Sequence, residues 1–598
     1  MLASNPSRMW SALTTVSIGC GGLLLGTALL LSDDLIEGLF LGTTTGALEW
    51  GPGLFRILLG FHGLVLILGA ILVWRNRRVD QNKTPLHAPS RSDDPGDSRT
   101  AASRATSLTT SLTTWWVLGL LCAVALGLRL WRLETGLWLD EILTLVDFVR
   151  LPAGSILTMF PDQNQHMLYS LLGHASVSIF GESAWALRLP AALFGTASIA
   201  ALFLLGRRLA GTTESLLACG LLTVSYHHIW FSQNARGYTG LLLFATVATW
   251  AWVSALPQRT ARGWIAYVAA VTLGMWTHTT MAFVVLTHAL SYIWLFCERH
   301  RQNTASHERL GSVWLPLAAL LLSTTLTLQL YALSLPDFFR SALHEESMKS
   351  QWTNVTWLIK ETLSGLKLGF GPSAVVIAGL LLLASGCWSI YRRNRLAAVV
   401  MILPGPLLCV TMMMLKHNLW PRFMFFSIGF GLLFAVRGTM LLAQVLVGFV
   451  SRTTLTDRRV AIVGTGVWAV VTVASLLTVP RCYALPKQDF AGAREFVNTQ
   501  IKSADAVVAI GLAALAYERY YAPHWPRVGS RPELEALRHN HADVWLIYTM
   551  PTHVETYLPD LWQSIQQNFE EVAVFPGTLR GGEVRVCRQR TASRQSVT

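Results

Sequence analysis

Long apolar segments recur along most of the chain and are separated by short polar connections. A helix of about 20 apolar residues is long enough to cross the roughly 30 Å hydrocarbon core of a bilayer. The apolar runs predict about thirteen transmembrane helices, at residues 9–31, 54–74, 115–131, 187–206, 213–231, 238–256, 263–279, 280–298, 312–333, 372–391, 396–415, 421–449 and 459–479. The pattern therefore predicts an α-helical polytopic membrane protein.

Two changes in this pattern predict the domain organisation. Residues 75–114 are polar and basic, too poor in apolar residues to form a core, and predict a flexible cytoplasmic linker between two N-terminal helices (1–74) and a membrane core (115–480). In 481–598 the apolar runs become short and alternate, with helices expected at 489–500, 512–521 and 557–568 and strands at 506–510, 543–548, 572–575 and 584–587. This order predicts a small soluble α/β domain at the C-terminus.

The basic residues predict the orientation in the membrane. They concentrate in alternate connections, such as Arg207-Arg208, Arg299-His300-Arg301 and Arg392-Arg393-Asn394-Arg395. Cytoplasmic loops are enriched in Lys and Arg, so the N-terminus is expected in the cytoplasm of a multi-pass plasma (inner) membrane protein. The outer side then receives loops 131–186 and 334–371 and the C-terminal domain. Within the first loop, the apolar run 166–180 is short for a span and predicts a helix lying along the interface.

The composition agrees with a membrane protein, and a membrane setting explains the positive net charge of the chain. Of the 598 residues, 52% are hydrophobic and only 14% are charged, which excludes an ordinary soluble chain. The formal net charge of +13 is explained by cytoplasmic loops and contact with anionic membrane lipids, so no nucleic acid partner is expected. The eight cysteines show no metal-ligand spacing, although Cys482 and Cys587 could form a disulfide in an oxidising compartment.

Asp140 and Glu141 form the most conspicuous candidate for chemistry. They follow the apolar run 115–131, and carboxylates at a membrane boundary are costly unless they are solvated or used. A carboxylate in this position can act as a general base toward a hydroxyl group. The pair could equally be solvated and neutralised by Arg132 or Arg150, so the dipeptide alone leaves both interpretations open.

Other polar groups are expected on the same outer side. Their residue types suit sugar hydroxyls and, for the cations, a lipid phosphate, although a contact with ordinary phospholipid is at least as good an explanation for any single one. The candidate substrate-binding residues are Asp162, His166, Tyr169, Arg236, Tyr238, Lys416, His417 and Arg422. A divalent metal held by Asp140, Glu141, Asp162 and His166 is possible, but their spacing is not diagnostic and no metal is assigned.

The order of these motifs is similar to that of a known family. Trp138-Leu139-Asp140-Glu141, the segment from Asp162 to Tyr169, the segment from Phe180 to Pro190 with Gly206-Arg207-Arg208-Leu209, and the later turns at 232–238 and 420–423 together resemble the GT-C membrane glycosyltransferases of the protein mannosyltransferase and aminoarabinose transferase type (glycosyltransferase family 39-like). The resemblance covers about residues 115–480. The two N-terminal helices lie outside that common core.

The resemblance implies transfer of a sugar from a polyprenyl-phosphate donor to a lipid, glycan or protein acceptor on the outer face, commonly with inversion. It implies that Asp140 is the candidate base or the carboxylate that orients the acceptor, and that Glu141 supports it. Where the family often has His-Pro-Pro-Leu-Tyr-Tyr, this chain has His166-Met167-Leu168-Tyr169-Ser170, which leaves the substrate class open.

Three other functions remain possible from the sequence. A transporter or lipid flippase also uses boundary charges, a polysaccharide polymerase or ligase also uses a prenyl-linked donor, and a non-catalytic scaffold could bind partners through its C-terminal domain. No inverted repeat is evident, and the charges gather on one predicted face, which favours an enzyme over a transporter.

Overall fold

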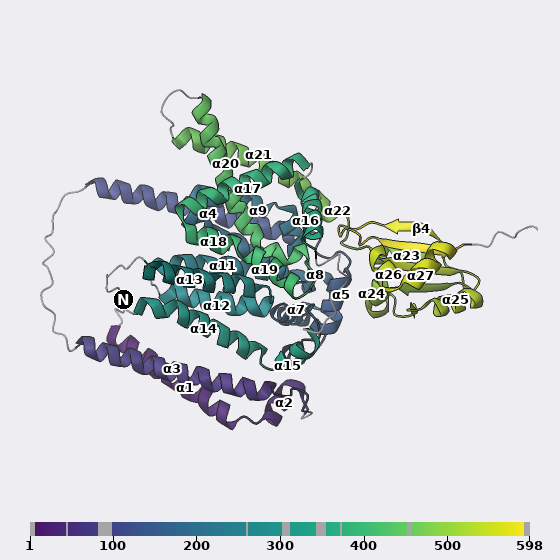
Figure 1. The fold of residues 1–598 in the computed structure, drawn as a ribbon, viewed down its shortest axis with the longest axis horizontal. Helices are drawn as coiled ribbons and strands as arrows, with labels where there is room; N and C mark the ends of the chain where they lie inside the picture. The colour runs from purple at the N-terminus through teal and green to yellow at the C-terminus, as the bar shows by residue number, and fades with distance from the viewer. Residues whose placement is uncertain are drawn as a thin grey trace, which may run out of the picture.

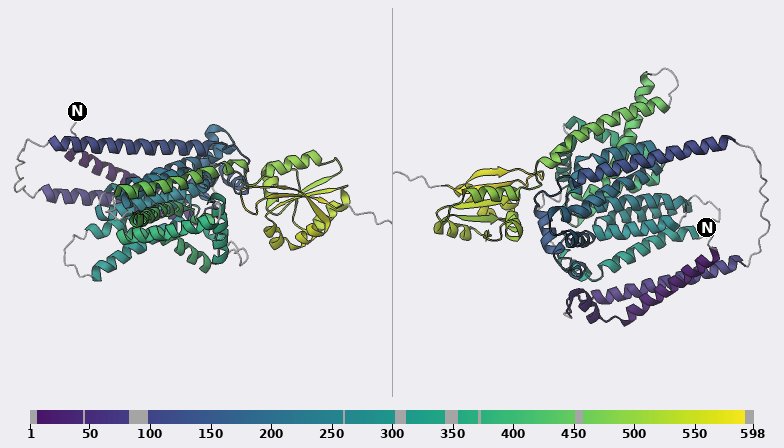
Figure 2. Two further views of the ribbon diagram at one scale, coloured as in Figure 1. Left: turned by 90° about the horizontal axis from the view of Figure 1, so that it is seen from above. Right: turned by 180° about the vertical axis from the view of Figure 1, so that it is seen from behind.

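The protein forms a long helical body with a small sheet domain at one end (Figure 1). The computed structural model describes residues 6–43, 46–81, 98–258, 261–301, 311–342, 354–370, 373–450 and 457–590. Views from above and from behind keep the sheet domain at the same end of the body (Figure 2). A polytopic helical membrane protein with a C-terminal sheet domain is therefore confirmed.

In the described part of the chain, ten helices are long and apolar enough to cross a membrane, or eleven if the bent pair Thr14–Leu30 and Asp33–Leu41 counts as one span. The predicted thirteen spans are not confirmed. The ten are formed by α3 (Gly51–Gln81), α4 (Ser98–Leu130), α8 (Ala184–Leu209), α11 (Tyr238–Gln258), α13 (Met281–Arg301), α14 (Gly311–Tyr331), α17 (Ser373–Arg393), α18 (Arg395–Ile402) with α19 (Pro404–Met414), η3 (Pro421–Ser427) with α20 (Ile428–Val450), and α21 (Asp457–Thr478) with α22 (Pro480–Ala484).

The run 213–231 is not one span because the chain breaks within it. It forms α9 (Thr212–Thr223) and α10 (Tyr226–Ser232), and the Ser225 side chain accepts a hydrogen bond from the first turn of α10. The break frees carbonyl groups at the end of α9, and the buried Arg129 guanidinium donates to two of them at 3.2 Å each. The run 263–279 forms α12 (Ala261–Thr277), a helix of only 17 residues.

The N-terminal helices α1 (Pro6–Leu30) and α3 pack against each other, and α2 (Asp33–Leu41) turns away between them. His62 and Gln329 tie this hairpin to α14 through a bond from His62 to Thr325 at 3.2 Å and one from Gln329 to the Phe55 carbonyl at 3.3 Å. Both ends of the segment expected to be a linker, 75–81 and 98–114, are helical, and its middle, 82–97, lies outside the described residues.

Two glycines allow α17 and α20 to cross closely. A methyl group at Gly386 would overlap the Phe434 carbonyl, and one at Gly438 would overlap the Leu382 carbonyl. Small residues at such crossings let helix backbones approach each other within a bilayer. The pair therefore fixes the separation of these two helices.

Gly386→Ala is expected to lower the stability of the purified protein in detergent by about 1–3 kcal/mol, because the helices must move apart. Thermal unfolding measures the change. Gly379→Ala is the matched control, since it lies on the same helix with nothing within 4 Å of its added methyl group. Equal melting temperatures for the two variants would contradict the close crossing.

The C-terminal domain is a five-stranded sheet in the order β2-β1-β3-β5-β4. Strands β2, β1 and β3 are parallel, and β5 and β4 are antiparallel additions. The predicted elements agree with β1 (Ala506–Ile510), β3 (Val544–Thr549), β4 (Phe569–Phe575), β5 (Val584–Gln589), α23 (Phe490–Gln500), α24 (Leu512–Ala516) with η4 (Tyr517–Tyr521), and α26 (Pro551–Tyr557) with α27 (Pro559–Asn568).

Two elements of this domain were not predicted. Strand β2 (Arg527–Val528) has only two residues, too few to show an alternating pattern, and α25 (Arg531–Asn540) is strongly polar. Cys482 and Cys587 are both free and buried, the first beside α10 and the second on β5 under the sheet. No disulfide therefore joins them.

Candidate active site

The loop that carries the two candidate carboxylates lies between the helical body and the sheet domain (Figure 1). Asp140 and Glu141 stand in the first turn of α5 (Leu139–Leu143), which continues into η1 (Thr144–Val149). Successive side chains on a helix point about 100° apart, so the two face different surroundings. The Asp140 side chain is 15% exposed and that of Glu141 is fully buried.

Glu141 is enclosed by partners. The Arg188 guanidinium of α8 donates to both carboxylate oxygens at 2.8 and 2.5 Å, the Ala235 amide donates at 2.8 Å, and the Lys487 ammonium lies at 3.7 Å. Burial opposes ionisation of Glu141, but the charges of Arg188 and Lys487 outweigh it and lower its pKa. Glu141 is thus an ionised carboxylate that ties the loop to α8 and to the turn before α11.

Asp140 meets two arginines that come from distant parts of the chain. Its Oδ2 accepts a hydrogen bond from Arg422 Nη1 of η3 at 2.8 Å, and Arg236 Nη1 lies at 3.8 Å. Arg236 stands in the turn before α11, with its guanidinium 5.9 Å from the centre of the Tyr238 ring. The structure therefore brings together three of the segments that the sequence placed on one face.

The segment before α7 (Met167–Phe180) completes this cluster. The Arg236 guanidinium donates to Asn164 Oδ1, and His166 Nδ1 accepts from the Gly237 amide at 2.7 Å. Nδ1 is therefore an acceptor, and Nε2 lies 3.5 Å from Arg236 Nη2, which is also a donor. Burial, followed by the charge of Arg236, holds the pKa of His166 well below its usual value, so this imidazole is neutral.

Asp162 lies beside this cluster and shapes its loop. Its Oδ1 accepts from the Asn164 amide at 2.7 Å. Burial raises the pKa of Asp162, with the Asn164 hydrogen bond acting against that effect. Asp162 therefore acts through Asn164, which in turn contacts Arg236.

Several polar atoms around Asp140 are buried without a hydrogen-bond partner in the part of the chain that the structure describes. They are Arg236 Nε, Arg422 Nε, Asn164 Nδ2 and His278 Nε2. His278 Nδ1 accepts from the Thr280 amide at 3.2 Å, so its Nε2 carries a proton, and all four atoms are donors. Buried donors are costly when unpaired, which makes this cluster suited to an oxygen-rich, anionic ligand.

Three predicted site residues do not join this cluster. The Tyr169 hydroxyl is fully buried and donates to the Leu187 carbonyl at 2.7 Å, so it fastens α7 to α8. Lys416 is exposed after the end of α19, and His417 is half-buried. The structure gives neither of them a contact with Asp140 among the described residues.

Arg188, Lys487, Asn164 and His278 were not singled out from the sequence. Arg188 is a lone charge inside the apolar run 187–206, and the rule that intramembrane charges are functional or paired could have identified it. Lys487 lies in an ordinary polar stretch after the last span and gives no comparable signal.

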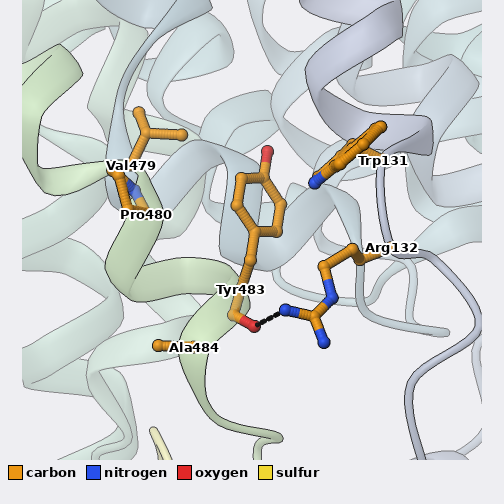
Figure 3. A pocket seen from close by; sticks show the side chains of 6 residues that line it. All are labelled: Trp131, Arg132, Val479, Pro480, Tyr483 and Ala484. Atoms are coloured by element: carbon orange, nitrogen blue, oxygen red, sulfur yellow. Dashed lines mark hydrogen bonds between the residues drawn. The ribbon is translucent and has the colours of Figure 1, made fainter.

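A surface depression of about 550 Å³ lies away from this cluster. Trp131, Arg132, Val479, Pro480, Tyr483 and Ala484 line it, where the ends of α4 and α22 meet (Figure 3). Arg132 donates to the Tyr483 carbonyl at 3.0 Å. With one cation among apolar and aromatic groups, it offers no carboxylate and no catalytic group.

The arrangement of the described side chains gives little support to a metal centre. Within the described ranges, no three or more His, Cys, Asp and Glu side chains are grouped so that they could hold a metal ion. The Glu141 carboxylate pairs with Arg188 and Lys487, so it is not free to bind a metal ion. The sequence leaves a divalent metal possible but unassigned, and it stays unassigned here.

Comparison with known proteins gives a family match in the membrane core. Residues 165–327 match the sequence model of the dolichyl-phosphate-mannose-protein mannosyltransferases, which confirms the resemblance predicted from the motifs for that segment. No curated protein matches the chain.

Solved structures of GT-C type are similar at low identity. ArnT from Cupriavidus metallidurans, bound to undecaprenyl phosphate, is 15% identical with a TM-score of 0.44, over 79% of this chain and 98% of that one. The archaeal oligosaccharyltransferase AglB from Archaeoglobus fulgidus, in complex with an inhibitory peptide and a dolichol-phosphate, is 13% identical with a TM-score of 0.46, over 82% of this chain and 75% of that one.

Proposed function

We propose that this protein is a membrane glycosyltransferase that moves a sugar from a polyprenyl-phosphate donor to an acceptor on the extracytoplasmic face. The observation that carries the proposal is the Asp140 carboxylate held at 2.8 Å by Arg422 and at 3.8 Å by Arg236, among buried donors that lack partners. A sugar linked to a lipid phosphate needs such a set, because a base and a phosphate site must lie next to each other.

The chemistry follows from the charges. The phosphate of the donor competes with Asp140 for the guanidinium groups of Arg236 and Arg422 and releases the carboxylate. The acceptor oxygen attacks the anomeric carbon and gives its proton to Asp140, while the bond from that carbon to the phosphate oxygen breaks. The electron pair leaves with polyprenyl phosphate, whose growing negative charge the arginines stabilise. Attack opposite the leaving group gives inversion.

The proposal includes the membrane setting. The protein would reside in the plasma (inner) membrane with its N-terminus in the cytoplasm and its sheet domain outside, as the basic loops favour. The match to a mannosyltransferase family supports mannose as the first sugar to test. A lipid, a glycan and a protein are all candidate acceptors.

A transfer assay tests this function. The full chain, purified and reconstituted in lipid nanodiscs, is given undecaprenyl phosphate that carries radiolabelled mannose, glucose or aminoarabinose, with an envelope extract as acceptor, with and without EDTA. Label should move to an acceptor as free undecaprenyl phosphate appears. In proteoliposomes, movement of the intact donor across the membrane without any release of undecaprenyl phosphate would identify a flippase and overturn the proposal.

Arg422→Gln is expected to weaken binding of undecaprenyl phosphate by about tenfold or more, because a charge-assisted bond to the phosphate is lost. Quenching of tryptophan fluorescence in nanodiscs measures the affinity. Arg393→Gln is the control, since Arg393 is an exposed arginine at the end of α17. Equal affinity in the Arg422 variant and the control would mean that the phosphate binds elsewhere.

A further inference from the structure

We propose that Lys487 and Gln488 are positioning residues that hold the Asp140 loop and the Arg236 turn in the geometry required for transfer. Both lie in the short segment between α22 and α23, which joins the last membrane helix to the sheet domain. The inference rests on the proposed function. It assigns to the sheet domain a part in building the site.

The Lys487 ammonium bridges the two segments. It donates to the Gln233 carbonyl at 2.5 Å and lies 3.7 Å from Glu141 Oε1. Gln233 is three residues before Arg236, and Glu141 adjoins Asp140. Since Lys487 is only 7% exposed, its charge is directed almost entirely at these two partners and at the Trp230 ring, 5.5 Å away. One side chain thus links the backbone just before Arg236 to the carboxylate next to Asp140.

The Gln488 amide makes a second link. Its Oε1 accepts from the Leu139 amide at 3.2 Å, one residue before Asp140. Its Nε2 donates to Thr549 Oγ1 at 3.2 Å, at the end of β3, and to the Gly582 carbonyl at 3.3 Å. Gln488 is 1% exposed, so every polar group of this side chain is used between the loop and the sheet.

The sheet domain supports these links through a wider contact. The Tyr521 hydroxyl of η4 donates to the Leu137 carbonyl at 2.8 Å, and Arg519 pairs with Asp147 at 2.5 Å. Buried side chains of α5 share one apolar cluster with those of α23 and α24. The domain therefore packs directly on the loop that carries Asp140, as its place beside α5 in Figure 1 illustrates.

The charges around Lys487 make this link sensitive to pH. The groups that face it are Glu141 of α5, Arg188 of α8 and the Cys482 thiol of α22. Burial lowers the pKa of Lys487 to about 7, and the Glu141 charge opposes that effect. Below this pH the ammonium attracts both Glu141 and Gln233, and above it the neutral amine loses the ion pair. The two segments should therefore loosen as the pH rises through about 7.

Overall stability should change in the opposite direction. In the unfolded chain the lysine keeps its proton up to its ordinary pKa near 10.4, so the unfolded state binds more protons than the folded state between about 7 and that value. The contribution of Lys487 to the free energy of unfolding therefore rises with pH in this range. Loosening of the site while stability holds or rises separates positioning from a merely structural role.

Lys487→Met tests the positioning role, because it keeps an unbranched apolar stem and removes the charge. Lys502→Met is the matched control, since Lys502 is an exposed lysine of the same domain. Hydrogen–deuterium exchange of segments 137–142 and 233–237 is measured in nanodiscs at about pH 6 and about pH 8.5, corrected for intrinsic rates, and kcat and KM are measured with the undecaprenyl-phosphate donor.

In the wild type and in Lys502→Met, exchange in both segments should rise between the two pH values. In Lys487→Met, exchange should be high at both, and kcat should fall by about tenfold or more at the lower pH with KM changed less than about twofold. Identical exchange and identical kcat profiles in Lys487→Met and the wild type would overturn the proposal.

Gln488→Leu provides a second variant in case Lys487→Met fails to fold. It should loosen 137–142 and leave 233–237 as in the wild type, because Gln488 contacts only the first segment. Unchanged exchange in 137–142 would contradict its role. If no variant, the wild type included, transfers sugar, the proposed function fails, while the exchange data still decide whether these residues hold the two segments.

Discussion

Asp140→Asn is expected to lower the rate of sugar transfer by about 10²- to 10⁴-fold, the range that a general base contributes. The amide keeps the size of the side chain and can still accept a hydrogen bond from Arg422, but it cannot take the proton of the acceptor. Because Asp140 is partly exposed and Glu141 carries the buried contacts, the fold should survive the change.

Single-turnover transfer from the undecaprenyl-phosphate donor in nanodiscs measures this effect, with thermal unfolding measured beside it. Asp560→Asn, at an exposed aspartate of α27, is the control for loss of one negative charge. Binding of undecaprenyl phosphate should be retained or strengthened in Asp140→Asn, since the arginines lose a competing carboxylate. Turnover equal to that of the wild type would remove Asp140 from the reaction.

Glu141→Gln, at the next residue, is expected to lower the stability of the protein by about 3–5 kcal/mol, whereas Asp140→Asn should leave the fold intact. The change removes the carboxylate that Arg188 holds through two bonds and leaves a buried guanidinium without its counter-charge. Lys487, the second cation of this group, loses its ion pair with Glu141 as well. Activity would then fall because little folded protein remains.

Yield after extraction and thermal unfolding in detergent measure this loss. Glu555→Gln is the control, since Glu555 is an exposed glutamate on α26. Normal melting of Glu141→Gln together with lost transfer would contradict the structural role and would return Glu141 to the list of catalytic candidates. The two neighbouring carboxylates are thus separable by experiment.

The membrane body could be predicted because apolar length is a strong constraint on helices in a bilayer. The predicted spans are wrong where a helix breaks and a side chain from another helix binds the carbonyl groups that the break exposes. The run 213–231 is mostly apolar from Leu216 to Val224, yet it breaks at Val224 and Ser225, where Arg129 binds the carbonyl groups that the break exposes. No local pattern could show that partner, which lies on another helix.

The candidate site could be predicted in part from the sequence. Alternating basic loops placed Asp140, Arg236 and Arg422 on one face, and the structure joins them directly. The sequence could not distinguish Asp140 from Glu141, because their different roles arise from a rotation of about 100° around α5. Nor could it identify Lys487, whose function depends on a burial that only the folded domain creates.

A structure of the full chain in nanodiscs with undecaprenyl phosphate bound tests most directly whether Asp140, Arg236 and Arg422 form the transfer site. The phosphate should lie within hydrogen-bond distance of Arg236 and Arg422, with Asp140 displaced from them and facing the position of the anomeric carbon. A phosphate bound instead in the depression beside Trp131 and Arg132, with the bond from Arg422 to Asp140 intact, would contradict a transfer site at Asp140.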